Sequence, residues 1–190
     1  MNVIETKLPG VVILEPKVFS DQRGFFVETF RETTLREAGI NQIFVQDNHS
    51  RSSKGILRGL HYQLVQPQGK LVRVSYGKVF DVAVDVRKGS PTFGQWVGTV
   101  LDDKELRMMY VPPGYAHGFV VLSEVADFIY KCTNYYHAES EQCIIWNDSD
   151  ISIEWPINDV SLSAKDRSAR SLSQLPAENL PSYNELCCIK

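Results

Sequence analysis

Short runs of β-branched and aromatic residues, separated by glycine and proline, recur along most of this 190-residue sequence. Many short strands with closely spaced turn signals are typical of an antiparallel sandwich or barrel. The pattern predicts strands at residues 11–14, 25–30, 42–46, 56–63, 70–76, 79–86, 95–101, 106–111, 118–122, 127–133 and 142–146. Helical segments do not alternate with these runs, so a doubly wound fold built from βαβ units is excluded.

The run at residues 79–86 has the clearest strand pattern. Its larger apolar side chains fall on one face and its aspartates on the other: Phe80, Val82, Val84 and Val86 against Asp81, Ala83 and Asp85. This alternation predicts a strand with one face on a core. A helix is predicted over residues 33–38, because a threonine can cap its start and Gly39 ends it. A second short helix is expected after Ser161.

Charge and cysteine content narrow the class of protein. Twenty basic residues against 23 acidic ones give a net charge of −3, which argues against general binding to nucleic acids or membrane surfaces. No apolar run is long enough to cross a membrane, and the first residues lack a signal-peptide core, so a cytoplasmic protein is expected. The cysteines form no CxxC pair and are expected as thiols: Cys132, Cys143, Cys187 and Cys188.

The chain is long enough for one domain, or at most two small ones. Residues 1–170 carry the strand pattern and are expected to form the folded domain. The more polar residues 171–190 are expected to be a partly flexible C-terminal tail, frayed after Pro181. GxGxxG, GxxxxGK[ST], HExxH and GxSxG do not occur, so chemistry based on NAD, a P-loop, a zinc protease or a serine hydrolase lacks its usual motif.

Two histidines have suggestive positions. On a strand, His61 shares a face with Gly59, whose missing side chain would leave room for a ligand. The alternative is a hydrogen-bonded structural histidine, which spacing alone favours. His117 follows the rigid turn at residues 112–114, a placement that suits a ligand contact at a barrel mouth. A turn-stabilising role for His117 is an equal alternative.

The histidine spacing argues against a metal site. Metal-binding jelly rolls place two histidines one residue apart on a strand, whereas His61 has Gly59 and Gln63 at the two-residue offsets. His61 and His117 alone leave a metal ion short of ligands unless other residues converge. No metal is therefore expected.

Cations and one tyrosine fall on or beside the predicted strands. Arg23, Arg58 and Lys70 suggest a phosphorylated or carboxylated ligand, with surface solvation as the alternative for each. Lys70 and Arg73 should point to opposite faces of one strand, with Arg73 in solvent. Tyr130 lies on an apolar strand face, where core packing is the usual role, although its hydroxyl could serve as an acid in a cavity.

Eight stretches of the sequence, taken in order, resemble one family. They include FSDQRGFF, LRGLHYQ and PPGYAHGF and lie at residues 19–26, 44–50, 57–63, 68–73, 90–94, 112–119, 130–136 and 162–166. They are similar to the dTDP-4-dehydrorhamnose 3,5-epimerase family over roughly residues 4 to 166, and eight ordered blocks are more specific than a single motif. The resemblance implies an all-β, cupin-type jelly-roll barrel with a few short helices. It also implies a homodimer that needs no metal or organic cofactor.

The implied reaction is epimerisation at C3 and C5 of a dTDP-4-keto-6-deoxyhexose, dTDP-4-dehydro-6-deoxy-D-glucose, on the way to dTDP-L-rhamnose. Both carbons flank the C4 carbonyl, so a base can remove a proton to form an enolate and a proton can return on the opposite face. The enolate oxygen needs a preplaced donor or cation. By resemblance, His61 is the base, Asp166 holds its tautomer, Lys70 faces the oxyanion and Tyr130 supplies the returning proton.

The resemblance also implies contacts with the nucleotide sugar. These are assigned to Phe19, Arg23, Phe26, Glu28, Gln46, Asn48, Arg58, His117, Tyr135, Glu141 and Lys165. On a regular strand Arg58 and His61 point to opposite faces, although both are assigned to one ligand. Either a bulge at Gly59 turns Arg58 inward, or Arg58 reaches the site of the partner subunit.

Three other functions compete with the 3,5-epimerase. One is an epimerase that acts only at C3 or only at C5 of a related nucleotide-linked ketosugar. Another is a non-catalytic cupin that binds sugar nucleotides, which the joint presence of a base, a lysine and an acid disfavours. The last is a metal-dependent cupin oxygenase or isomerase, which activity in the presence of a chelator would exclude.

Overall fold

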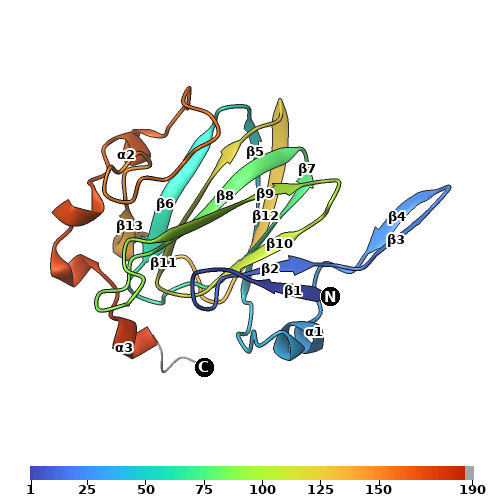
Figure 1. Ribbon diagram of the computed structural model, residues 1–190, viewed down its shortest axis with the longest axis horizontal. Helices are drawn as coiled ribbons and strands as arrows, with labels where there is room; N and C mark the ends of the chain where they lie inside the picture. Colours follow the sequence, from blue (N-terminus) through green and yellow to red (C-terminus); the bar gives the residue numbers. More distant parts are fainter. Residues whose placement is uncertain (187–190) are drawn as a thin grey trace.

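Two antiparallel sheets packed face to face form the body of the protein in the computed structural model, which describes residues 1–186 (Figure 1). The six-stranded sheet has the order β1 (Asn2–Glu5), β2 (Val12–Glu15), β10 (Met108–Val111), β7 (Lys70–Tyr76), β12 (Val125–Cys132) and β5 (Gln46–Ser53). The five-stranded sheet has the order β13 (Glu141–Cys143), β6 (Leu57–Gln63), β11 (Tyr115–Val121), β8 (Lys78–Asp85) and β9 (Trp96–Asp102). The expected jelly-roll barrel is confirmed.

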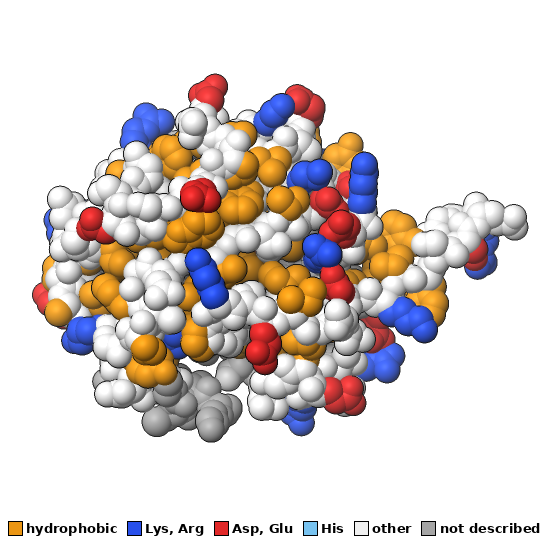
Figure 2. All heavy atoms as spheres, in the orientation of Figure 1, with side chains coloured by type: hydrophobic (Ala, Val, Ile, Leu, Met, Phe, Trp, Pro, Cys, Tyr) orange, Lys and Arg blue, Asp and Glu red, His pale blue; other side chains and the backbone are white. Residues whose placement is uncertain are grey.

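A two-stranded hairpin and a few short helices complete the fold. The hairpin, β3 (Val18–Asp21) and β4 (Gly24–Val27), extends away from the barrel as an arm (Figures 1 and 2). The helices are α1 (Glu32–Glu37), α2 (Ala164–Arg167) and α3 (Tyr183–Leu186), with 3₁₀ turns at Ala138–Ser140, Leu172–Gln174 and Ala177–Asn179. Both predicted helices are present, the first shifted by one residue. None of the helices within residues 1–186 is long and apolar enough to cross a membrane.

Apolar side chains form three buried layers. The central layer fills the space between the two sheets and includes Val72, Ala83, Met109, Phe119 and Phe128. A second layer lies on the outer face of the five-stranded sheet, where the C-terminal segment covers it, and includes Leu60, Val82, Val84, Ile144 and Leu172. The third packs α1 against the six-stranded sheet and includes Leu14, Leu35, Met108 and Tyr110. The central strands of the five-stranded sheet, β8 and β11, are therefore buried on both faces.

This layering changes the interpretation of residues 79–86. The apolar face of β8 packs under the C-terminal segment, as Val82 and Val84 show. Its other face, with Asp81 and Ala83, points into the barrel and is also fully buried. A buried carboxylate needs a partner, so the aspartates of this strand mark polar sites inside the protein.

Several predicted strand boundaries are wrong. The segment 42–46 is largely loop, and the strand that follows it, β5, has the polar sequence QDNHSRSS. β5 is a strand because it pairs with β12 along its length. Its sequence can be polar because it lies at the edge of the sheet with one face open to solvent. β1 and β3 were not predicted, and the run at 25–30 ends as a strand at Val27. His117 lies within β11 rather than ahead of it.

The described part of the expected tail packs against the barrel. Leu172 is buried in the layer over the five-stranded sheet. The hydroxyl of Tyr62 donates a hydrogen bond to the carbonyl of Asn179 at 2.7 Å, and the backbone N–H of Lys88 donates to the carbonyl of Pro181 at 2.8 Å. The predicted thiols Cys187 and Cys188 lie outside the described residues.

Gly59 permits the close approach of β6 and β11 at the site described below. Its φ is +129°, and a Cβ there would lie 2.5 Å from Cα of Gly118. We expect Gly59→Ala to lower the free energy of unfolding by at least about 2 kcal/mol, since backbone strain and a backbone clash add. Gly89→Ala is the matched control, because Gly89 has a positive φ but nothing within 4 Å of its added Cβ. The free energy of unfolding is measured by urea denaturation. An equal decrease in the two variants would show that the backbone clash at Gly59 contributes nothing.

Candidate active site

A cavity of about 520 Å³ lies between the two sheets. Its lining includes eight of the residues that the sequence predicted for the site: Arg58, His61, Lys70, His117, Tyr130, Glu141, Lys165 and Asp166. They come from β6, β7, β11, β12, β13 and α2. The fold therefore brings together side chains that are up to 108 positions apart in the chain, from Arg58 to Asp166 (166 − 58 = 108).

His61 and Asp166 form a hydrogen-bonded pair at one wall of the cavity. The distance from Nε2 of His61 to Oδ1 of Asp166 is 2.6 Å. Burial alone would raise the pKa of Asp166, but the hydrogen bond and charge of His61, together with hydrogen bonds involving Ser163 and Cys143, hold that pKa below its usual value. The backbone N–H of Asp166 donates to the hydroxyl of Ser163, which caps α2 and orients the carboxylate. An ionised Asp166 fixes the tautomer of His61 with the hydrogen on Nε2, which leaves Nδ1 as the basic nitrogen.

Lys70 and Tyr130 belong to the opposite sheet and line the same cavity. Within residues 1–186, the structure gives the Lys70 ammonium group no hydrogen-bond or ion-pair partner. Burial lowers the pKa of Lys70 below its ordinary value of 10.5. Burial also raises the pKa of Tyr130 above 10.0, so its phenol is protonated near neutral pH. The cavity thus holds a base on one sheet and a cation and an acid on the other.

A second histidine–carboxylate pair lies deeper in the barrel. Nε2 of His117 lies 3.0 Å from each carboxylate oxygen of Asp81, and both residues are buried. Burial raises the pKa of Asp81, whereas the charges of His117 and Lys70 act in the opposite direction. Asp81 was not predicted as a site residue. The signal was present in the sequence, because a charged residue in an apolar strand needs a buried partner.

A bulge in β6 resolves the conflict between Arg58 and His61. His61 pairs with His117 and Arg58 pairs with Phe119, so the register shifts by one residue between them. Paired residues share a sheet face, and the bulge therefore turns both Arg58 and His61 into the cavity. The expectation that Gly59 leaves room for a ligand is wrong, because the backbone of His117 and Gly118 fills that space.

Comparison with known proteins agrees with this geometry. The sequence model described as dTDP-4-dehydrorhamnose 3,5-epimerase matches residues 5–174. The chain belongs to the dTDP-4-dehydrorhamnose 3,5-epimerase family. It is therefore an isomerase, and the resemblance found in the sequence is confirmed.

Relatives of this epimerase are similar over nearly their whole length. The dTDP-4-dehydrorhamnose 3,5-epimerase of Salmonella typhimurium is 57% identical over 92% of this chain and 97% of its own. That of Pseudomonas aeruginosa is 54% identical over 91% and 97%. The crystal structure of a 3,5-epimerase from Legionella pneumophila in complex with dTDP-4-keto-L-rhamnose matches with a TM-score of 0.94 and 55% identity, over 96% of this chain and 98% of the other.

Seven predicted contact residues of the epimerase lie outside the cavity lining. Phe19, Arg23 and Phe26 are on the hairpin β3–β4, and Glu28 follows it. The Arg23 guanidinium pairs with Asp21 at 2.5 Å, a partner that the sequence interpretation did not include. Tyr135 lies in the loop after β12 and is 62% exposed.

The last two of the seven residues, Gln46 and Asn48, lie on a strand of the barrel. Both lie on β5, and Asn48 pairs directly with Tyr130, so its side chain shares the cavity-facing side of the sheet. The Gln46 amide donates to the Asn48 side-chain oxygen at 3.2 Å. These two residues therefore extend the polar surface of the epimerase cavity beyond its lining.

The structure adds residues that the sequence did not single out. Cys143 lies opposite His61 in the β13–β6 pair, and its thiol donates to Oδ1 of Asp166 at 3.5 Å. The Ser50 hydroxyl lines the cavity and, in the part of the chain described, is buried without a hydrogen-bond partner. Phe119 and Phe128 stack at 4.0 Å and form an apolar wall. In each case the sequence alone did not show that the residue lies on a strand that faces the cavity.

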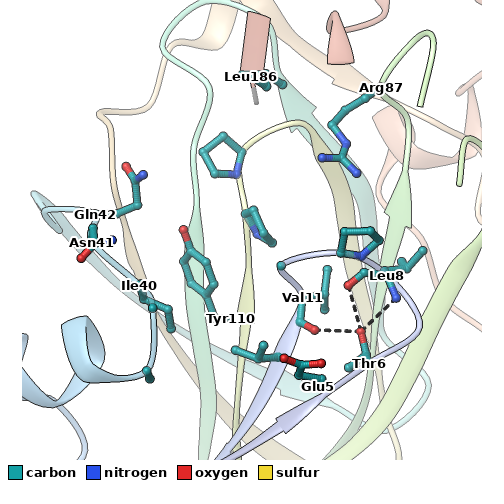
Figure 3. A pocket seen from close by; sticks show the side chains of 17 residues that line it. Glu5, Thr6, Leu8, Val11, Ile40, Asn41, Gln42, Arg87, Tyr110 and Leu186 are labelled. Carbon is teal, nitrogen blue, oxygen red and sulfur yellow. Dashed lines mark hydrogen bonds between the residues drawn. The ribbon is translucent and has the colours of Figure 1, made fainter. Parts of the chain in front are cut away.

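A larger hollow, of about 620 Å³, lies elsewhere on the epimerase (Figure 3). It is bounded by the turn between β1 and β2, the loop after α1 and the turn at Pro112-Pro113. Among residues 1–186 its lining includes no histidine or lysine, and Arg87 is held by Asp85 at 2.7 Å. The smaller cavity, not this hollow, holds the groups that proton transfer needs.

Proposed function

We propose that the chain converts dTDP-4-dehydro-6-deoxy-D-glucose to dTDP-4-dehydro-L-rhamnose by epimerisation at C3 and C5, a step in dTDP-L-rhamnose biosynthesis in the cytoplasm. The observation that carries this proposal is the His61–Asp166 pair on one sheet facing Lys70 and Tyr130 on the other, across one cavity. Family membership and the named activities of the relatives support it.

His61 acts as the base. Asp166 accepts the hydrogen on Nε2, so Nδ1 takes the proton from the carbon next to the C4 carbonyl. The ionised Asp166 then stabilises the imidazolium that forms. An unaided C–H acid is far too weak for imidazole, and each pKa unit of mismatch costs about 1.4 kcal/mol. A second interaction must therefore stabilise the enolate.

Lys70 supplies that interaction and Tyr130 completes the inversion. The Lys70 ammonium group faces the C4 oxygen, where negative charge develops, in a cavity with the apolar wall of Phe119 and Phe128. Low polarity strengthens this contact. Tyr130 donates its phenolic proton to the opposite face of the carbon. Each inversion leaves His61 protonated and Tyr130 ionised until exchange with solvent resets both, and no step requires a metal or organic cofactor.

Anionic parts of the substrate meet cations near the cavity. The Arg58 guanidinium, which donates from Nε to the hydroxyl of Ser52 at 3.1 Å, is exposed and suits the diphosphate. Lys165 pairs with Glu141, which also accepts a hydrogen bond from Tyr136 at 2.8 Å. Glu141, Lys165 and His117 therefore contact the sugar side of the substrate in this proposal.

Proton NMR in D₂O tests the function. Incubation of dTDP-4-dehydro-6-deoxy-D-glucose with the protein should introduce deuterium at both C3 and C5, because the returning protons come from solvent. A downstream reductase would trap the inverted product. Absence of exchange with folded protein that still binds dTDP would overturn the proposal.

A single-site epimerase is the second candidate. A structure described as a 3′-monoepimerase from Streptomyces bikiniensis, in complex with dTDP-quinovose, is 33% identical to this chain with a TM-score of 0.88. One scaffold therefore accommodates both outcomes, and the higher identity to 3,5-epimerases favours the double reaction. Deuterium at one carbon only would establish the single-site enzyme.

Tyr130→Phe separates proton removal from inversion. The variant keeps His61 and Lys70, so deuterium exchange should continue, whereas product should fall by about 10²-fold because the opposite-face acid is lost. Exchange and product formation are measured in the same NMR sample. Tyr76→Phe, on the exposed end of β7, is the matched control. Product at the wild-type level in Tyr130→Phe would assign the acid to another residue.

The hairpin β3–β4 belongs to a partner's site in the proposed homodimer. Its phenylalanines are strongly exposed in the single chain: Phe19 53%, Phe25 58% and Phe26 68%. Exposed aromatic groups on a projecting arm favour an interface with another protein surface. Phe19, Arg23 and Phe26 match substrate contacts of the family yet lie outside their own cavity. A second copy of the chain reconciles these observations.

Mixed dimers test this arrangement. A His61→Ala chain and a Phe19→Ala/Phe26→Ala chain should each be nearly inactive alone. Random mixing should restore roughly a quarter of the wild-type activity, since half of the dimers are mixed and each has one intact site. Hairpins that act within their own subunit would give no restoration. Sedimentation equilibrium checks that both variants are dimers.

A further inference from the structure

A thiol lies directly beside the proposed base. Cys143 is opposite His61 in the pairing of β13 with β6, and both face the cavity side of the sheet. The Cys143 thiol lies 3.5 Å from Oδ1 of Asp166, and the same oxygen lies 2.6 Å from Nε2 of His61. The donor atoms of His61, Cys143 and Asp166 all lie within 4.8 Å of one another. Three different ligand types therefore converge at one point.

We propose that His61, Cys143 and Asp166 bind Zn²⁺ reversibly and that the bound ion inhibits the enzyme. Zinc takes nitrogen, thiolate and carboxylate ligands in a tetrahedral arrangement, at about 2.0–2.3 Å from each. Ligand atoms around one tetrahedral ion at these bond lengths lie about 3.3–3.6 Å apart, so the 3.5 Å between Cys143 and Asp166 already fits and the 2.6 Å between His61 and Asp166 must lengthen by about 0.7 Å. The His61 side chain is 26% exposed to the cavity, so solvent can fill the fourth position.

The surrounding charges favour a cation at this point. Asp166 is ionised, and Oε1 of Glu141 lies 3.9 Å from Nδ1 of His61. Lys165 is paired with Glu141, so these two residues together add no net charge beside the site, and Asp166 supplies its negative charge. The other described cysteine, Cys132, lies near Lys70 and accepts a hydrogen bond from Asn48 at 3.6 Å. The positive charge of Lys70 disfavours a cation at Cys132 and makes that residue a useful comparison.

Binding changes the protons of the pair in a defined way. The Cys143 thiol loses its proton to solvent and coordinates as the thiolate. Nε2 of His61 gives its lone pair to the ion, and the hydrogen it carried moves to Nδ1. Nδ1 can then no longer accept a proton from the substrate, so the base is blocked. Inhibition rests on the function proposed above, whereas ion binding does not.

Cobalt(II) tests the site by a spectroscopic signal that is independent of turnover. The experiment uses the full chain carrying Cys187→Ser and Cys188→Ser, so that the two thiols outside the described residues are absent. One Co²⁺ per chain should produce a thiolate-to-cobalt charge-transfer absorption, which Zn²⁺ should bleach by displacement. Adding Cys143→Ser should remove the absorption, whereas adding Cys132→Ser should leave it. Adding His61→Asn should weaken Co²⁺ binding at least about tenfold.

Zinc sensitivity of turnover tests the inhibitory effect. The zinc concentration for half inhibition should rise at least about tenfold in Cys143→Ser, with each variant compared to its own zinc-free rate, and EDTA should restore activity. Circular dichroism verifies that the variants fold. No charge-transfer absorption, or one that persists without Cys143, would overturn the site. If the zinc concentration for half inhibition were the same in Cys143→Ser as in the protein that keeps Cys143, the proposal that zinc inhibits by binding Cys143 would be overturned.

Discussion

His61→Ala should lower kcat by about 10³- to 10⁴-fold, at the upper end of what a general base contributes. Deuterium exchange should disappear at both C3 and C5, because one imidazole serves both carbons. Binding of dTDP, measured by calorimetry, should change by no more than a few-fold, since the nucleotide contacts other residues. The measurement is turnover and exchange by NMR under identical conditions.

His49→Ala is the matched control for this variant. His49 lies on β5, with its side chain 56% exposed and near Asp127, away from the cavity. We expect it to keep near wild-type turnover. Full exchange in His61→Ala would remove His61 as the base and leave Asp166 without its assigned role.

Lys70→Met should lower kcat by about 10²- to 10³-fold, the usual cost of removing one group that stabilises an oxyanion. Methionine keeps the length and most of the volume of the side chain, so the variant isolates the charge. Lys78→Met is the control, because Lys78 is exposed at the start of β8 and lies 3.9 Å from Asp102. Wild-type turnover in Lys70→Met would assign the oxyanion contact elsewhere.

The pH profile gives an independent check on Lys70. Burial lowers its pKa below 10.5, so the charged form, and with it kcat, should be lost on the alkaline side at a lower pH than for an ordinary lysine. Burial raises the pKa of Tyr130 above 10.0, so its phenol does not account for a decline that begins below that pH. In Lys70→Arg, whose guanidinium keeps its charge, kcat should be lower but free of this alkaline decline. If kcat of Lys70→Arg fell at the same alkaline pH as that of the wild type, the decline would belong to the titration of another group.

Much of the candidate site could be predicted from the sequence, because the family motifs carry residue identity. The motifs identify His61, Lys70, Tyr130 and Asp166, and these four side chains line one cavity. The role of Arg58 could not be predicted, since its direction depends on a register shift between β6 and β11. Cys143 was missed because it acts through a neighbour on another strand, whereas Asp81, a charged residue in an apolar strand, was a signal that the sequence contained.

The sequence by itself determined the strand-rich architecture, the short helices and the family, because turn residues, alternation and ordered motifs are local signals. Only the tertiary structure decided that β5 is a strand despite its polar sequence, that both faces of β8 are buried and that the hairpin β3–β4 projects from the barrel. These features depend on pairing between distant segments. A single-residue change in register reverses the face of every following side chain, and local sequence does not encode it.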